Sequence, residues 1–155
     1  MGWFVVAKQA DRREFRKEIR EQFKELRGSI DEVRTRAETY WLHEDPSKSA
    51  PDATALSSEI RRLARYTRNL EQAGLKFNSI PLIVQVRSLA TGGDFQSRSR
   101  QRSDADQDRL DDLSGALEDV LSAADDAFYS EFHATKPRRW LRWIPLIGAF
   151  FLTTD

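Results

Sequence analysis

Few residues in this chain are suited to acid–base or metal chemistry. His43 and His133 are the only imidazoles, and each lies close to an acid, Glu44 or Glu131. If the first and last helices packed in parallel, the two histidines would approach each other and could form a two-His, carboxylate metal site. Histidines at unrelated positions are more often surface or capping residues. We therefore expect no catalytic residue, no bound metal ion and no cofactor.

Two short motifs resemble binding loops but lack essential positions. The stretch 104–108 (DADQD) resembles the start of an EF-hand, but Arg109 stands where glycine is needed and Gly115 where a bidentate glutamate is needed. Gly-Gly at 92–93 is not followed by the Lys-Ser/Thr of a phosphate loop. The absence of cysteine excludes disulfides and thiol nucleophiles. These observations argue against an enzyme and suggest no small-molecule substrate.

Nucleic-acid binding has weak support. Arg98, Arg100 and Arg102 alternate with serines and could contact phosphate or flank phosphorylation sites. Three cations are few for such binding, and an acidic stretch follows at once. The whole chain carries 25 Lys+Arg and 25 Asp+Glu, so its net charge is zero. We expect a solvated loop here and no nucleic-acid partner.

The elements that must position any site are helical. The chain has 155 residues, of which 39% are hydrophobic and 32% charged, and it contains only 7 Gly and 5 Pro. Globular chains average about 45–50% apolar and about 25% charged. A charge-rich chain of this kind buries a narrow seam between helices more easily than a wide core. The fold predicted is all-α: an elongated antiparallel helical bundle or coiled-coil-like hairpin.

Four helices are predicted. The longest covers 8–43, where apolar residues recur every three or four positions in a heptad pattern. The second runs over about 53–73, with Asp52 or Thr54 as its N-cap and Gly74 just after its end. A short apolar helix follows Asn78 or Ser79 and ends at Gly92, and the last helix spans about 106–134. The predicted seam comprises Phe15, Ile19, Phe23, Leu26, Ile30, Val33, Leu56, Ile60, Leu63, Leu70, Leu110, Leu113, Leu117 and Phe128.

Charge is distributed unevenly among these helices. Arg61, Arg62, Arg65 and Arg68 give the second helix a basic outer face, whereas 104–131 holds ten acidic residues and one basic residue. Opposite charges favour these elements as neighbours in one antiparallel bundle. The organisation predicted is the first three helices in 1–90, a flexible polar linker at 91–107, an acidic helix packing on the first two at 108–135, and a hydrophobic tail at 136–155.

The C-terminal tail carries the clearest functional signal. Cations lead directly into tryptophans and an apolar run too short to span a bilayer. Anionic headgroups attract the cations, and indoles favour the membrane interface. The expected membrane or partner contacts are Arg138, Arg139, Trp140, Arg142, Trp143, Ile144, Leu146, Ile147, Phe150 and Phe151.

The N-terminal segment 3–7 (WFVVA) is apolar as well, and it stops at Lys8. We expect a turn folded onto the bundle, the alternative being an interfacial contact at headgroup depth. If both apolar ends enter one membrane, an even number of helices must separate them, or the linker must run back along the bundle. The two ends also resemble the edges of membrane spans, as in a piece of a longer membrane protein.

The function expected is a non-enzymatic helical scaffold or complex subunit. It would be cytoplasmic and peripheral at the inner face of a membrane, bound to anionic lipid through the tail. The long seam would pair with a second copy or with a partner protein. The alternative is a soluble protein–protein interaction module whose tail docks on a partner or back on its own bundle.

Overall fold

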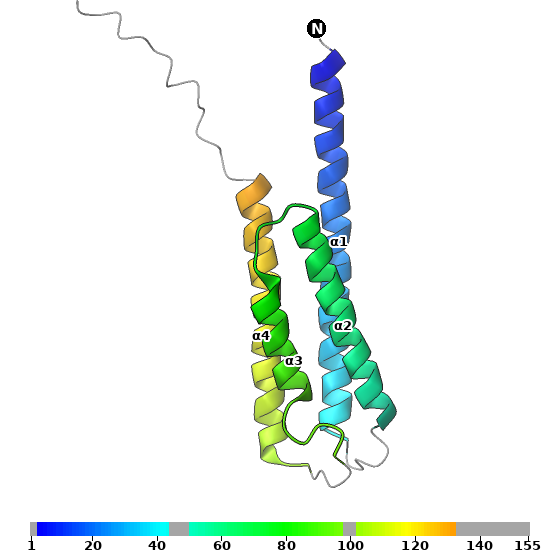
Figure 1. The fold of residues 1–155 in the computed structure, drawn as a ribbon, viewed down its shortest axis with the longest axis vertical. Coiled ribbons are helices and arrows are strands. Elements are labelled where there is room, and N and C mark those ends of the chain that lie inside the picture. The colour runs from blue at the N-terminus through cyan, green and yellow to red at the C-terminus, as the bar shows by residue number, and fades with distance from the viewer. Residues whose placement is uncertain (1–2, 44–49, 98–101, 133–155) are drawn as a thin grey trace, which may run out of the picture.

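The computed structural model describes residues 3–43, 50–97 and 102–132, with side chains in the first helix from Glu14 onward. Within these ranges the chain is all-helical, as predicted, and contains no strand. The helices are α1 (Trp3–Trp41), α2 (Ala50–Gln72), α3 (Ser79–Thr91) and α4 (Asp104–Phe132) (Figure 1).

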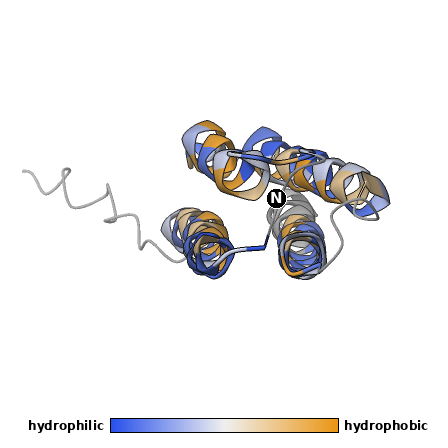
Figure 2. Cartoon of the chain, turned by 90° about the horizontal axis from the view of Figure 1, so that it is seen from below, coloured by the Kyte–Doolittle hydropathy of each residue, from blue (hydrophilic) through white to orange (hydrophobic). Residues whose placement is uncertain are grey.

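Successive helices run in opposite directions and form one bundle. α1 packs on α2 and α4, and α3 packs on the same two helices, so that α2 and α4 lie across the bundle from each other. Figure 2, which looks along the bundle axis, shows the resulting two layers, α1 with α4 and α2 with α3. The acidic helix therefore packs on the first helix as predicted, whereas it touches the second only sparsely, diagonally across the bundle. The predicted neighbours, acidic α4 and basic α2, are thus not adjacent within one chain.

Heptad-spaced residues of all four helices meet in the core. α2 buries Leu56, Ile60, Leu63, Thr67 and Leu70, a stripe with steps of four and three residues. The predicted seam residues of α1 and α4 are buried too, with two exceptions: Phe15 is 37% exposed and Phe128 is partly buried. The seam that the sequence offered to a second chain is thus occupied within this one.

Of the two predicted boundaries of α2, the C-terminal one is confirmed and the N-terminal one is wrong. Gly74 ends α2 as predicted: it adopts φ +101°, its N–H donates to the Glu71 carbonyl, and the Leu75 N–H donates to the Leu70 carbonyl. These are the paired bonds of a Schellman motif. The predicted N-cap at Asp52 or Thr54 is wrong, because α2 already begins at Ala50. Pro51 suits a first helical turn, since it has no N–H to leave unbonded.

α4 begins at Asp104, two residues before the predicted start, and Asp106 caps it with the carboxylate half of a capping box. The Asp106 carboxylate accepts the Ser103 N–H at 3.0 Å, and the Asp106 N–H donates to the Ser103 carbonyl at 3.0 Å. This exchange satisfies N–H groups that have no partner inside the helix. Of the predicted linker, Thr91 still belongs to α3, and residues 93–96 form a turn.

The expected N-terminal turn folded onto the bundle is wrong. The backbone is helical from Trp3, and α1 continues straight past the level where α4 ends (Figure 1). α1 is about 58 Å long at 1.5 Å per residue, which is longer than any of the other three helices. Its N-terminal turns therefore extend beyond the end of α4. Across the described ranges, no helix combines the length and apolarity required of a membrane span.

Candidate functional site

Both apolar segments of the chain start from one end of the bundle. Contacts between α1 and α4 proceed in opposite directions along the two helices: Phe15 meets Phe132, Phe23 meets Phe128, and Trp41 meets Arg109. The first turn of α1 and the last turn of α4 therefore share an end, which we call the N/C end. The opposite end, where α1 finishes and α4 begins, is the distal end.

Aromatic side chains of α1 and α4 form a cluster at the N/C end. The ring centroids of Phe128 and Phe132 are 4.8 Å apart, and those of Phe15 and Phe132 are 5.8 Å apart. The Arg16 guanidinium lies 5.5 Å from the centre of the Phe132 ring. Tyr129 is 60% exposed. Aromatic rings with cations above them suit a water–lipid boundary or a protein partner better than bulk water.

A shallow groove of about 380 Å³ lies between α1 and α4 below this aromatic cluster. Phe23, Phe128 and Tyr129 form its apolar part, and Arg20, Lys24, Arg27 and Asp125 form its rim. Arg27 and Asp125 make an ion pair across the groove at 3.5 Å. The pair is largely solvent-exposed and contributes little to stability. The rim thus carries three cations, all from α1, and one carboxylate from α4.

The N-terminal half of α1 is basic. Six cations lie on 8–20, against three acids. The predicted tail contacts, from Arg138 to Phe151, lie outside the described residues, as does His133. Four more cations stand at 136–142 in the sequence, immediately before and among the tail tryptophans. Along the sequence, positive charge is therefore concentrated next to both apolar segments.

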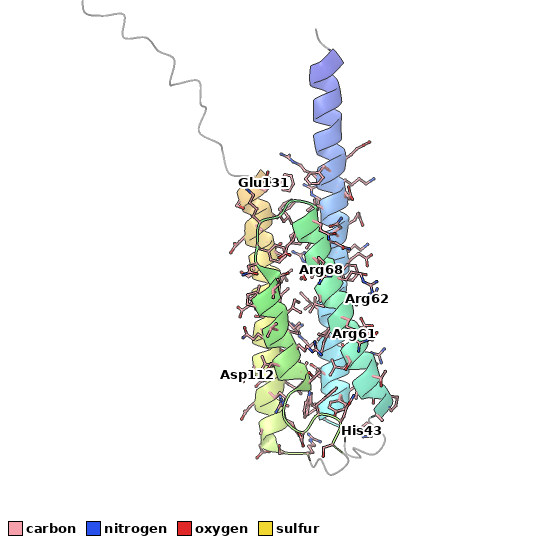
Figure 3. The ribbon with its side chains drawn as sticks, viewed as in Figure 1. His43, Arg61, Arg62, Arg68, Asp112 and Glu131 are labelled. Carbon is pink, nitrogen blue, oxygen red and sulfur yellow. The ribbon has the colours of Figure 1, made fainter. Side chains whose placement is uncertain are left out.

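The conditional idea of a paired histidine site is wrong. It required the first and last helices to be parallel, whereas α1 and α4 are antiparallel. His43 follows the last turn of α1 at the distal end, and Phe132, the residue before His133, lies at the N/C end (Figure 3). In the ranges described, no group of three metal-ligating side chains occurs.

The distal end is closed by a cluster that the sequence pattern did not reveal. The Trp41 indole N–H donates to the Ala90 carbonyl at 3.1 Å, and Arg109 Nη1 donates to the Leu89 carbonyl at 3.2 Å. The Arg109 guanidinium also lies 4.5 Å from the centre of the Trp41 ring. Both side chains therefore satisfy carbonyls at the C-terminus of α3. The available signal was Arg109 itself, the one cation in an acidic helix.

A polar contact joins α1 to α2 midway along the bundle. Arg62 Nε donates to the Tyr66 hydroxyl at 3.2 Å, and that hydroxyl donates to Glu25 at 3.1 Å. The hydrogen bond to Tyr66 raises the pKa of Arg62 above its ordinary value, with further contributions from the charges of Tyr66 and Glu59. The Arg62 guanidinium therefore stays charged and does not act as an acid. The contact orients the side chains of Arg62, Tyr66 and Glu25.

Comparison with known proteins adds no further constraint. No protein-family model, curated protein or solved structure matches the chain. Its surfaces must therefore be interpreted from their own chemistry.

Proposed function

We propose that this protein is a non-enzymatic helical scaffold that binds peripherally to the inner, cytoplasmic face of an anionic membrane. The C-terminal basic–aromatic tail is the principal contact, and the first turn of α1 is a second one. The observation that supports this most is the antiparallel packing of α1 and α4, which starts both apolar segments from the N/C end. Four alternating helices also meet the even-number condition that a shared membrane imposes.

The lengths of the two segments are compatible with one membrane plane. Trp3 lies twelve positions before Phe15 in α1, which raises Trp3 about 18 Å above the Phe15–Phe132 contact. Trp140 is eight residues beyond Phe132, and an extended chain of that length reaches up to about 26 Å. The tail can therefore bring its tryptophans to the height of Trp3. The basic residues of both segments would then lie at headgroup level.

Self-association is the scaffold activity that we propose. The seam is buried within the chain, so association must use another surface. Arg61, Arg65 and Arg68 are exposed on α2. Exposed acidic residues such as Asp112 and Glu131 lie on α4, across the bundle (Figure 3). Tyr66 meets Glu25 and Asp125 meets Arg27, so the basic stripe lies level with the last third of α4.

The direction of the helices restricts how copies can associate. α2 and α4 are parallel to each other and lie on opposite sides, so a two-fold dimer cannot use both charged faces at once. Copies related by a sideways translation can, and every copy then presents its N/C end in the same direction. Exposed ion pairs are individually weak, so such an array requires the high local concentration of a membrane surface.

Vesicle flotation tests the membrane proposal. The full chain should float with vesicles that contain phosphatidylglycerol and much less with neutral phosphatidylcholine vesicles. A chain lacking 138–155 should lose most of this binding, and the triple substitution R138Q/R139Q/R142Q should lose the preference for anionic lipid. Equal flotation of the full and shortened chains would exclude the tail as the membrane contact.

A soluble interaction module is the second candidate, because the groove between α1 and α4 exposes Tyr129 in the last turn of α4. In that case the tail docks on protein rather than on lipid. The full chain would stay monodisperse without detergent and would not float with vesicles of either composition.

A further inference from the structure

A second cavity, of about 300 Å³, lies on the other layer of the bundle, between α2, α3 and the turn that follows α3. Its floor is apolar and consists of Ile60, Ile83 and Phe95. Ile60 is 4% exposed, and Phe95 packs on Tyr40 with ring centroids 4.8 Å apart. The floor is therefore fixed by the core beneath it, and the volume is at the lower end of the range for small-molecule sites.

Two guanidinium groups from different helices line the rim of this cavity. Arg61 comes from α2 and Arg87 from α3. Across the described ranges neither side chain makes an ion pair or a hydrogen bond, whereas Arg27, Arg36 and Arg62 each pair with an acid. Two cations held without a counter-ion above an apolar floor create a local positive potential. Ser57 and Gln96 add polar atoms to the same rim.

The turn that closes the cavity has a constrained backbone. Gln96 is the one non-glycine residue with positive φ, at 64°, in the described part of the chain. Its N–H donates to the Tyr40 hydroxyl at 2.7 Å, and that bond holds the turn against the end of α1. A non-glycine residue in this region is unfavourable unless the surroundings impose it. The bond to Tyr40 accounts for the conformation, which keeps Phe95 and Gln96 facing the cavity.

We propose that this cavity binds a small amphipathic anion: a phosphate monoester, sulfonate or carboxylate joined to one ring or a short aliphatic chain. The two guanidiniums hold the anionic group, for which planar, forked donors are well suited, and the apolar part covers Ile60, Ile83 and Phe95. This inference goes beyond the proposed function and does not depend on membrane binding, since the cavity lies on the side of the bundle. Of its two arginines, Arg61 also belongs to the basic stripe proposed to contact a second copy, whereas Arg87 does not.

Titration of the ¹⁵N-labelled full chain with hexyl phosphate tests the proposal. We expect saturable shifts of the Thr91 and Gln96 amides. R61Q and R87Q should each weaken binding about tenfold, the usual scale for a lost charge-assisted hydrogen bond. R65Q removes the same charge from the same helix outside the cavity and should bind like the parent chain. Because all three arginines are exposed, each variant should retain the circular dichroism spectrum of the parent chain.

A competition experiment distinguishes a lipid headgroup from a free metabolite as the source of the anion. Dihexanoylphosphatidate presents a lipid headgroup. If it displaces hexyl phosphate, the ligand is a lipid; if hexyl phosphate binds and the phosphatidate does not displace it, the ligand is a free metabolite. Equal binding of uncharged hexanol would overturn the proposal, as would an R65Q chain weakened as much as R61Q. Absence of saturable shifts at Thr91 and Gln96 would overturn it too.

Discussion

Arg109 lies over the Trp41 indole, with its guanidinium carbon 4.5 Å from the ring centre, and joins the end of α1 to the start of α4. Each of the two side chains also donates to a carbonyl in the last turn of α3. Three helix ends therefore meet at one contact. Since α3 is only 13 residues long, this contact holds the shortest helix of the bundle in place.

Replacement of Arg109 by alanine should lower the free energy of unfolding by about 2 kcal/mol, because it removes a charge-assisted hydrogen bond and a partly buried cation–π contact. R109K should recover part of the loss, since lysine keeps the charge but not the planar fork. R87A, on the exposed face of α3, should change stability by less than about 0.5 kcal/mol. Urea unfolding followed by circular dichroism measures all three, and an R109A chain as stable as R87A would show that the contact carries no stability.

Glycine-to-alanine substitutions should have opposite effects at different positions. At Gly92 a Cβ would lie 2.4 Å from the Ser88 carbonyl oxygen, and at Gly93 it would lie 2.8 Å from Arg109 Nη2 with φ at +65°. Both substitutions should destabilise the fold by at least about 1 kcal/mol. Gly115 sits inside α4 with open space around it, so G115A should stabilise by about 0.5–1 kcal/mol. Thermal unfolding gives the signs directly; a stabilising G93A would mean that the turn is not as described.

The capping bond of α4 should be measurable through Asp106, which is 5% exposed. D106A leaves the Ser103 N–H without its acceptor and should cost about 1–2 kcal/mol. D108A removes an exposed carboxylate of the same helical turn and is the matched control, with an expected change below about 0.5 kcal/mol. Chemical denaturation of both variants in the same buffer compares them. Equal losses would attribute the effect to helix charge rather than to capping.

Charge reversal should test the proposed array on membranes. A chain with R61E, R65E and R68E has two acidic faces, and a chain with E118K, D119K and D126K has two basic ones. Each alone should cross-link poorly on anionic vesicles, because like charges then face each other. An equimolar mixture should restore cross-linking, and high salt should abolish it in the parent chain. If neither variant changes the cross-linking yield, the charged faces do not mediate contact between copies.

The helices could be predicted from the sequence wherever apolar residues recur at helical spacing. Leu56, Ile60, Leu63 and Leu70 recur at helical spacing, and each lies in the core. Gly74 was identifiable as a helix end because only a residue tolerant of positive φ suits that position. Local patterns of this kind predict helices, but they leave open which helix packs beside which.

Contacts between residues of different helices could not be predicted from the sequence. Charge favoured the acidic helix beside α2, yet burial of the apolar stripes placed it beside α1 and α3, since exposed ion pairs are worth far less than buried leucines. The cavity on α2 and α3 joins Arg61 to Arg87, 26 positions apart in the sequence. Neither arginine belongs to a motif, so only the packing of two helices shows that they share a rim.

The central claim is that the N/C end faces the membrane with both of its apolar segments, and quenching of tryptophan fluorescence by lipids brominated in their acyl chains tests it most directly. Three full-length chains would each retain one of Trp3, Trp41 and Trp143, with phenylalanine at the other tryptophan positions. On anionic vesicles, the account predicts strong quenching of Trp3 and Trp143 and none of Trp41, which is buried at the distal end. Quenching of Trp41 as strong as that of Trp143, or an unquenched Trp3 beside a quenched Trp143, would contradict it.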